Sequence, residues 1–156
     1  MRALAVALVL LAAWSVHAME PPEFIKCADW SVRRVDGALE VSTTAIFYNP
    51  NRRGRLKVRS IDLEVFAADR SLGTIDQLDR RIKVRPQQPF EIPLRITVRP
   101  DASRSEVVRG LYAALTGQSM VFHVRGVVKV TALFVRLKVR VDESQEVRLR
   151  DVVRGQ

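Results

Sequence analysis

The sequence Ala45-Ile46-Phe47-Tyr48-Asn49-Pro50-Asn51, followed by Arg52-Arg53-Gly54-Arg55, is the stretch from which the fold can be inferred. Its apolar run ends at Asn49-Pro50-Asn51, because proline cannot donate to a strand ladder and holds the residue before it extended. Asn51 tolerates unusual backbone dihedrals and can hydrogen-bond to its own backbone. A second alternating run begins at Leu56. The stretch therefore predicts two β-strands joined by a corner.

Strand patterns continue on both sides of this corner. Leu39 to Tyr48 alternates cleanly, and Asp36-Gly37 just before it is a strong hairpin signal. The alternation that starts at Leu56 changes phase near Arg59-Ser60, which predicts either a bulge or a strand that passes from one sheet to another. Gly126 lies inside a further strand pattern and predicts a bend or a close backbone approach.

The most regular alternation lies near the C-terminus, where every second residue is apolar: Leu133, Val135, Leu137, Val139 and Val141. We expect these residues to face the core, with Phe134 and several cations on the opposite face. Asp142-Glu143-Ser144 predicts a turn before a last short strand.

One segment, residues 103–116, has the pattern of a helix. Ser103-Arg104-Ser105-Glu106 has the form of a capping box, and Gly117 is placed to end the helix. Apolar residues recur at helical spacing, so we expect this stripe to pack across an open end or an edge of the sheets. About 7 to 9 short strands with one inserted helix favour an all-β antiparallel β-sandwich over a barrel or an α/β fold.

The segment 1–18 has the pattern of a secretory signal peptide. Met1-Arg2 is a short positive start, the run from Ala3 to Val16 is uncharged and mostly apolar, and Val16-His17-Ala18 offers small residues at the cleavage positions. The alternative is an uncleaved N-terminal membrane anchor, although an apolar run that extends at most from Ala3 to Met19 is at the short limit for a membrane span. We expect cleavage near Ala18 and an exported protein, periplasmic or secreted. The expected divisions are residues 1–18 as signal peptide, 19–23 as extended leader, 24–150 as the β-sandwich domain and 151–156 as a tail.

The chain is strongly basic. Its formal charge is +9, and removing the segment 1–18 takes away one charged side chain, Arg2, which leaves +8. A basic exported protein attracts anionic membrane surfaces, lipopolysaccharide or acidic polymers, and we do not expect nucleic acid as a partner. The alternative is that the cations only solvate the wet faces of amphipathic strands. If such strands are sheet neighbours, however, like charges stand opposite each other at a cost in stability, which would point to an anionic partner. The candidate contacts are Arg52, Arg53, Arg55, Arg136, Lys138 and Arg140.

The sequence contains no recognisable catalytic or cofactor motif. His123 is the one histidine after residue 18 and Cys27 the one cysteine, which is too few for a zinc site. Neither a Gly-x-Ser-x-Gly elbow nor a phosphate-binding Gly-rich loop is present, although the sequence leaves a Ser-His-Asp triad open. We expect His123 on a strand face, Cys27 as a buried thiol, and a protein that is not an enzyme and holds no metal or cofactor.

With its strands placed, the chain resembles the late embryogenesis abundant type 2 domain, also called the water stress and hypersensitive response domain. The likeness rests on the strand that ends at Asn49-Pro50-Asn51, on Leu56 to Val65 with its continuation Leu72-Gly73, and on the apolar-Pro-Leu strand Phe90 to Ile96. The helix and Val124-Arg125-Gly126 also fit. The likeness covers nearly all of the chain after the signal peptide.

This resemblance implies an immunoglobulin-like or fibronectin type III-like β-sandwich with no conserved catalytic residue. Plant members are linked to desiccation, cold and pathogen stress, and bacterial members are often exported. For this chain the resemblance implies a stress-protective role, or interaction with membranes or client proteins in the cell envelope. The alternative is a basic binding or assembly module for an anionic envelope component. Four motif residues are expected to be structural: Asn49, Pro50, Asn51 and Gly73.

Overall fold

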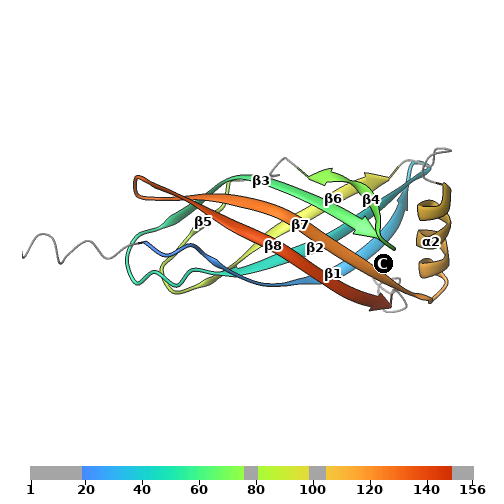
Figure 1. The fold of residues 1–156 in the computed structure, drawn as a ribbon, viewed down its shortest axis with the longest axis horizontal. Coiled ribbons are helices and arrows are strands. Elements are labelled where there is room, and N and C mark those ends of the chain that lie inside the picture. The colour runs from blue at the N-terminus through green and yellow to red at the C-terminus, as the bar shows by residue number, and fades with distance from the viewer. Residues whose placement is uncertain (1–18, 76–80, 99–104, 149–156) are drawn as a thin grey trace, which may run out of the picture.

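The computed structural model describes residues 19–75, 81–98 and 105–148, which form eight β-strands and one α-helix (Figure 1). The residues of the expected signal peptide and of the C-terminal tail lie outside these ranges. The elements in chain order are β1 (Glu23–Val35), β2 (Ala38–Tyr48), β3 (Leu56–Ala67), β4 (Arg70–Ile75), β5 (Lys83–Val84), β6 (Pro89–Val98), α2 (Ser105–Leu115), β7 (Ser119–Ala132) and β8 (Val135–Arg148).

The strands form two antiparallel sheets that face each other, so the predicted all-β sandwich is confirmed. Sheet A has the order β1-β2-β6, and sheet B has the order β4-β3-β7-β8, with β5 paired to β3. Side chains join the two sheets where β1 lies beside β8. The backbone N–H of Cys27 donates to Oε2 of Glu143 at 2.7 Å, and Nε1 of Trp30 donates to Oε1 of Gln145 at 3.2 Å.

The core fills the space between the sheets because each strand alternates buried and exposed side chains. In β2 the odd-numbered residues from Leu39 to Phe47 are buried, as their alternation predicts. The ring of Trp30 in sheet A stacks on Phe122 in sheet B with centroids 4.6 Å apart. Pro93 lies in β6, an edge strand of sheet A in the described part of the chain, where a missing N–H costs no ladder bond.

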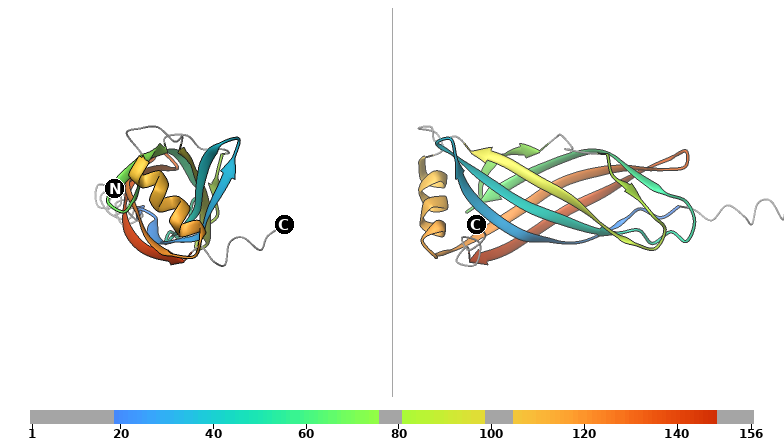
Figure 2. Two further views of the ribbon diagram at one scale, coloured as in Figure 1. Left: turned by 90° about the vertical axis from the view of Figure 1, so that its right-hand side faces the viewer. Right: turned by 180° about the vertical axis from the view of Figure 1, so that it is seen from behind.

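The helix covers one open end of the sandwich, as its apolar stripe predicts (Figure 2). Val108 and Leu111 are buried, and Gly110 lies so close to β7 that a Cβ there would be 2.9 Å from the methyl group of Met120. The helix ends just before Gly117, whose φ of 97° suits glycine. Residues 103 and 104 of the expected capping box lie outside the described ranges.

Two predicted irregularities are present as local backbone features. Asp36 and Gly37 both have positive φ and form the tight turn between β1 and β2. The phase change near Arg59-Ser60 is a bulge in β3, because the register against β7 shifts between Val58 and Ser60 while the strand continues. The alternative of a strand that changes sheet is therefore wrong.

The C-terminal part of the chain differs from its prediction. Leu133 does not face the core; together with Phe134 it forms the two-residue turn between β7 and β8, and Val135 is also exposed. The predicted turn at Asp142-Glu143-Ser144 is wrong, because β8 runs on to Arg148. Unbroken pairing with β7 supplies backbone partners along the whole of β8, and this pairing outweighs the low strand propensity of three polar residues.

Candidate anion-binding face

The Asn49-Pro50-Asn51 corner is a buried polar junction. Asn49 has 0% of its surface exposed, and its Nδ2 donates to the carbonyl oxygen of Arg85 at 3.0 Å. Its Oδ1 accepts hydrogen bonds from the backbone N–H of Asn51 at 3.1 Å and from Nδ2 of Asn51 at 2.9 Å. The Asn49 backbone N–H donates to the carbonyl of Gln88 at 3.0 Å. Each polar atom of the Asn49 side chain thus has a partner inside the protein, as a buried amide requires.

Asn51 fixes the place where the chain enters the domain. Its Nδ2 donates to the carbonyl oxygen of Glu20 at 2.8 Å, and its Oδ1 accepts from the backbone N–H of Glu20 at 2.9 Å. The side-chain amide therefore pairs with the leader as a strand residue would. The corner has a structural role in joining the leader, the end of β2 and the turn before β6.

Gly73 in β4 lies opposite β6 of the other sheet. Its φ is 142°, in the region that favours glycine, and a Cβ added there would lie 2.9 Å from Cδ1 of Ile96 in β6. Because the end of the Ile96 side chain can move aside, the backbone conformation is the main reason for glycine at this position.

The exposed side of sheet B carries cations on four neighbouring strands near the β7–β8 turn. Lys83 on β5 is directly opposite Lys57 on β3, which is opposite Thr131 on β7, which is opposite Arg136 on β8. One row across the sheet thus holds three cations and a hydroxyl residue. The bulged Arg59 lies beside this row, where its Nε donates to Oγ1 of Thr131 at 3.2 Å.

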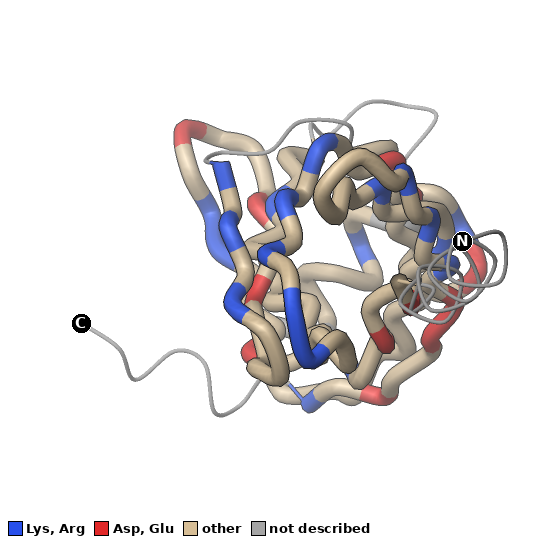
Figure 3. The backbone as a smooth tube through the Cα atoms, turned by 90° about the vertical axis from the view of Figure 1, so that its left-hand side faces the viewer, with Lys and Arg blue, Asp and Glu red and all other residues tan. Residues whose placement is uncertain are grey.

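A second row also contains directly opposed like charges. Lys129 on β7 is the register partner of Lys138 on β8, and both side chains are exposed. We call these cations the basic face: Lys57, Arg59, Lys83, Lys129, Arg136, Lys138 and Arg140. Figure 3, which views the molecule from the end with the β7–β8 turn, shows Lys and Arg on adjacent segments along one side of the sandwich.

Charge is unevenly distributed along the outside of sheet B. Three acidic residues on its outer side lie further toward the helix than the basic face, namely Glu64, Asp142 and Glu146, whereas Asp62 lies in the same row as Arg140, because both are register partners of Val127. Ion pairs within the described part of the chain, such as Arg70 with Glu106 and Arg95 with Glu40, involve no cation of the basic face. The positive charges near the β7–β8 turn are therefore not neutralised by salt bridges in the described ranges.

The structure separates the six predicted contacts into two adjacent groups. Arg136, Lys138 and Arg140 lie on the basic face, whereas Arg52, Arg53 and Arg55 are exposed in the loop that follows the corner. That loop lies next to the β7–β8 turn, because a Cβ on Gly54 would be 3.8 Å from Cγ of Leu133.

Sequence reasoning did not single out four cations of the basic face as contacts: Lys57, Arg59, Lys83 and Lys129. Lys129 lies in a mixed run interrupted by Gly126, where strand parity is harder to follow. Only the β7–β8 register shows that it stands opposite Lys138.

His123 takes part in a hydrogen-bonded triplet on the outside of sheet B. Its Nε2 lies 2.6 Å from Oδ1 of Asp142, and its Nδ1 lies 3.0 Å from Oγ of Ser144. These are the residue types of a hydrolase triad, but they stand on the exposed face of two strands, and the Asp142 side chain is 69% exposed. The arrangement lacks the enclosed, water-excluded surroundings on which oxyanion stabilisation depends.

Cys27 is a buried thiol beside a carboxylate. Burial, and after it the negative charge of Glu143, raises the pKa of Cys27 to about 12. Because the thiolate is the reactive form of cysteine, this thiol is inert at neutral pH. Its place in the core agrees with the structural role expected from the sequence.

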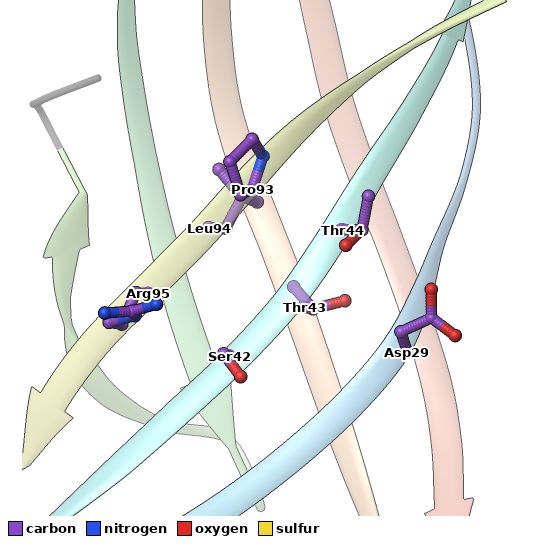
Figure 4. Close-up of a pocket in the computed structure, with 7 residues that line it drawn as sticks. All are labelled: Asp29, Ser42, Thr43, Thr44, Pro93, Leu94 and Arg95. Atoms are coloured by element: carbon purple, nitrogen blue, oxygen red, sulfur yellow. The ribbon is translucent and has the colours of Figure 1, made fainter. Parts of the chain in front are cut away.

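A small depression lies on the outside of sheet A (Figure 4). It has a volume of about 150 Å³, below the usual range of ligand pockets. Its lining includes the hydroxyl residues Ser42 and Thr43, with Asp29 and Arg95 at either side. Two of the three hydroxyl residues in the lining, which also includes Thr44, already have partners within the fold, since Ser42 pairs with Ser31 and Thr43 donates to the carbonyl of Ala28. This depression is therefore a weaker candidate than the basic face.

Two further observations concern side-chain clusters and helix length. In residues 19–75, 81–98 and 105–148, no three His, Cys, Asp or Glu side chains gather as a metal ion would require. Within the same ranges, no helix is long and apolar enough to cross a bilayer.

Comparison with known proteins gives the fold. No protein-family model and no curated protein matches the sequence. A protein from Archaeoglobus fulgidus, known from a crystal structure, is similar with a TM-score of 0.51 and 8% identity over 81% of this chain and 97% of that chain. A protein from Arabidopsis thaliana, known from a solution structure, is similar with a TM-score of 0.55 and 12% identity over 83% of this chain and 82% of that one. At such identities, the likeness shows a shared β-sandwich fold.

Proposed function

We propose that this protein is an exported, non-enzymatic β-sandwich domain that binds an anionic component of the cell envelope through its basic face. The observation that carries the proposal is the direct opposition of Lys129 to Lys138 and of Lys57 to Lys83 on neighbouring strands. Like charges in this position destabilise a sheet. Their presence in two separate strand pairs supports a benefit outside the fold, and an anionic partner supplies one.

Solvation alone is a poorer explanation of the same residues. Any polar residue can face the solvent on the outer side of a strand. The part of sheet B nearer the helix has residues of both charges there, such as Glu64 opposite Arg125. The basic face instead concentrates one sign of charge, which raises the local concentration of anions and speeds their association.

The shape of the face favours an extended partner. Its cations lie on neighbouring strands, which are about 4.8 Å apart, and on alternate residues, which are about 6.6 Å apart along each strand. A surface that presents many acidic groups, such as lipid headgroups, lipopolysaccharide or an acidic polymer, can meet several of these cations together. An isolated small anion would gain little on so open a surface.

The test compares two double variants that remove the same amount of charge. Lys129→Gln/Lys138→Gln alters the basic face, whereas Lys26→Gln/Arg34→Gln removes two exposed cations from sheet A. Binding to heparin, used as a soluble polyanion, should fall severalfold more for the first variant and should weaken with salt for the wild type. Equal binding by the two variants would show that net charge, rather than this face, drives the association.

Export is tested separately by the N-terminus of the native protein. Mass spectrometry of protein isolated from its host should give a chain that begins at Met19. A chain that still contains residues 1–18 would replace export with membrane anchoring by that segment.

The family resemblance supports a second candidate function, which is protection of membranes or proteins during water stress. It is favoured by the structural roles of the motif residues, since Asn49 and Asn51 build the corner and Gly73 has a backbone conformation that suits glycine. The purified protein should then preserve liposomes or a labile enzyme through drying at concentrations where albumin does. Protection no better than that of buffer would exclude this role.

A further inference from the structure

The turn between β7 and β8 exposes an unusual apolar tip. Phe134 is 100% exposed, Leu133 68% and Val135 46%, and these three consecutive residues project at the end of the longest hairpin (Figure 1). We call Leu133, Phe134 and Val135 the hairpin tip. Single exposed apolar residues are common on proteins, but three in succession at the end of a hairpin form a local apolar patch.

The residues of the hairpin tip also do not suit the backbone conformation of the turn that they form. Leu133 has a φ of 54°, and Phe134 does not share this positive value. A two-residue turn with positive φ at its first position favours glycine there, and asparagine also tolerates such a φ. A leucine is strained in this conformation, because its Cβ comes too close to the following carbonyl oxygen. Leu133 and Phe134 thus neither pack in the core nor stabilise the turn.

Arginines surround the hairpin tip. Arg136 follows it directly on β8, and Arg52, Arg53 and Arg55 are exposed in the loop whose Gly54 lies against Leu133. Further cations of the basic face continue from there, with Lys138 about 13 Å from Phe134 along the strand, at about 3.3 Å per residue. The hairpin tip is therefore followed along the strand by positive charge. The distance that these charges span is similar to the thickness of a lipid headgroup layer plus one Debye length.

The chain enters the domain at this same end. The side chain of Met19 lies against Gly54, since a Cβ there would be 3.2 Å from the Met19 methyl group, and Glu20 is held by Asn51. The N-terminal leader, the arginine loop and the hairpin tip therefore share one end of the molecule, opposite the helix (Figure 1).

We propose that the hairpin tip inserts into the headgroup region of an anionic lipid bilayer, with Leu133 and Phe134 at the boundary of the acyl chains and the surrounding arginines on lipid phosphates. This proposal rests on the proposed function and identifies the anionic partner of the basic face as a membrane surface. Aromatic and aliphatic side chains next to cations are the combination that binds such interfaces. A soluble acidic polymer would account for the cations but not for the exposed Phe134.

The main test replaces the hairpin tip without weakening the fold. In Leu133→Gly/Phe134→Ser, glycine suits the positive φ, so the melting temperature should be equal to or above that of the wild type. The control is Val121→Ser, which removes a similarly exposed apolar residue from β7 near the helix end. Co-sedimentation uses vesicles of phosphatidylglycerol and phosphatidylethanolamine, and of phosphatidylcholine alone. Heparin binding is measured in parallel, and the N-terminus of each preparation is established by mass spectrometry.

The expected result is a loss of roughly tenfold or more in partitioning to the anionic vesicles for the tip variant, because two large apolar side chains no longer leave water. Val121→Ser should partition as the wild type does, and all three proteins should bind heparin equally. Undiminished vesicle binding by the tip variant would overturn the insertion proposal while leaving the basic face as the binding site. Wild-type binding to heparin but not to vesicles would overturn the membrane as partner, and binding to neither would overturn the proposed function as well.

A second measurement reports insertion directly. In Phe134→Trp, the new indole should show a blue-shifted emission with anionic vesicles and quenching by lipids brominated on their acyl chains, relative to the wild-type signal. Emission that stays unshifted and unquenched while the protein is bound would show that the tip remains in water, and would overturn the proposal. Concentration-dependent dimerisation that is lost in the tip variant, without vesicle binding, would assign the tip to a protein contact instead.

Discussion

Lys129 and Lys138 face each other as register partners on β7 and β8, and both side chains are exposed. The ladder bonds hold their backbones together, while the two ammonium groups repel each other. Directly opposed like charges lower the stability of an antiparallel pair, whereas opposite charges raise it by about 0.2–1 kcal/mol. A single substitution that removes the repulsion at this pair should therefore raise the stability of the protein and weaken the proposed anion binding.

We predict that Lys138→Glu makes the protein more stable and a weaker binder of anions. The new carboxylate faces Lys129, so the free energy of unfolding should rise by roughly 0.5–1 kcal/mol in urea titrations at low salt. Binding to anionic vesicles or heparin should fall severalfold, because one attraction is replaced by a repulsion. The matched control is Lys26→Glu on sheet A, which changes the net charge equally. A loss of stability in Lys138→Glu would show that the two lysines do not repel each other as their register implies.

A second prediction concerns the corner, where Asn49→Ala should unfold easily but bind normally when folded. The substitution removes the donor to the Arg85 carbonyl and the acceptor for two N–H groups of Asn51, all inside the protein. Buried groups left without partners cost about 1–3 kcal/mol each, so a loss of roughly 3 kcal/mol is expected in chemical denaturation. Gln88→Ala, an exposed neighbour whose backbone carbonyl is retained, should cost about 0.5 kcal/mol at most. Reduced vesicle binding by the folded Asn49→Ala protein would give the corner a role beyond structure.

Much of this fold follows from local sequence signals. Asp36-Gly37 specifies its turn through backbone dihedrals, and the phase change near Ser60 requires either a bulge or a change of sheet, because each one-residue slip reverses a strand's faces. The register against β7 then selects the bulge. The position of the helix is predicted in the same way, since an apolar stripe at helical spacing must be buried against the sheets. These inferences succeed because each depends on residues that are neighbours in the chain.

The features that sequence reasoning missed depend on partners far away in the chain. The alternation through Leu133 and Val135 has the pattern of a single strand. Periodicity alone does not show that its first residue, Leu133, lies in a turn. Whether Lys129 opposes Lys138 is a matter of register, which the hairpin turn sets. The basic face could thus be suspected strand by strand, but its like-charge pairs and the apolar tip beside it emerge only from the assembled sheet.

Gly126 gives a third prediction, because β7 lies beside β3 at very close range there. A Cβ at Gly126 would lie 2.1 Å from the carbonyl oxygen of Asp62 and 2.9 Å from Cα of Leu63. Since backbone atoms cannot move aside as a flexible side chain can, Gly126→Ala should cost about 3 kcal/mol or more. Gly37→Ala is the matched control: its φ is also positive, at 80°, but no atom lies within 4 Å of the added Cβ, so it should cost about 1 kcal/mol. Thermal unfolding that ranks the two variants equally would contradict the close approach of the strands.

The buried thiol of Cys27 provides a prediction in alkaline solution. Burial and the charge of Glu143 raise the pKa of Cys27 from its ordinary value near 9 to about 12 in the folded protein. Between these values the unfolded chain has lost the thiol proton while the folded chain keeps it, so the free energy of unfolding should fall as the pH rises from 9 toward 12, by up to about 1.4 kcal/mol per pH unit from this group. The Cys27→Ala variant has no thiol to ionise, so its free energy of unfolding should decline less steeply over the same pH range. The cavity left in its core lowers the stability by a constant amount at every pH. Urea titrations of both proteins at several pH values between 8 and 11 measure the difference, with near-ultraviolet circular dichroism to confirm that each starts folded. Parallel curves would mean that Cys27 ionises as readily in the folded protein as in the unfolded chain.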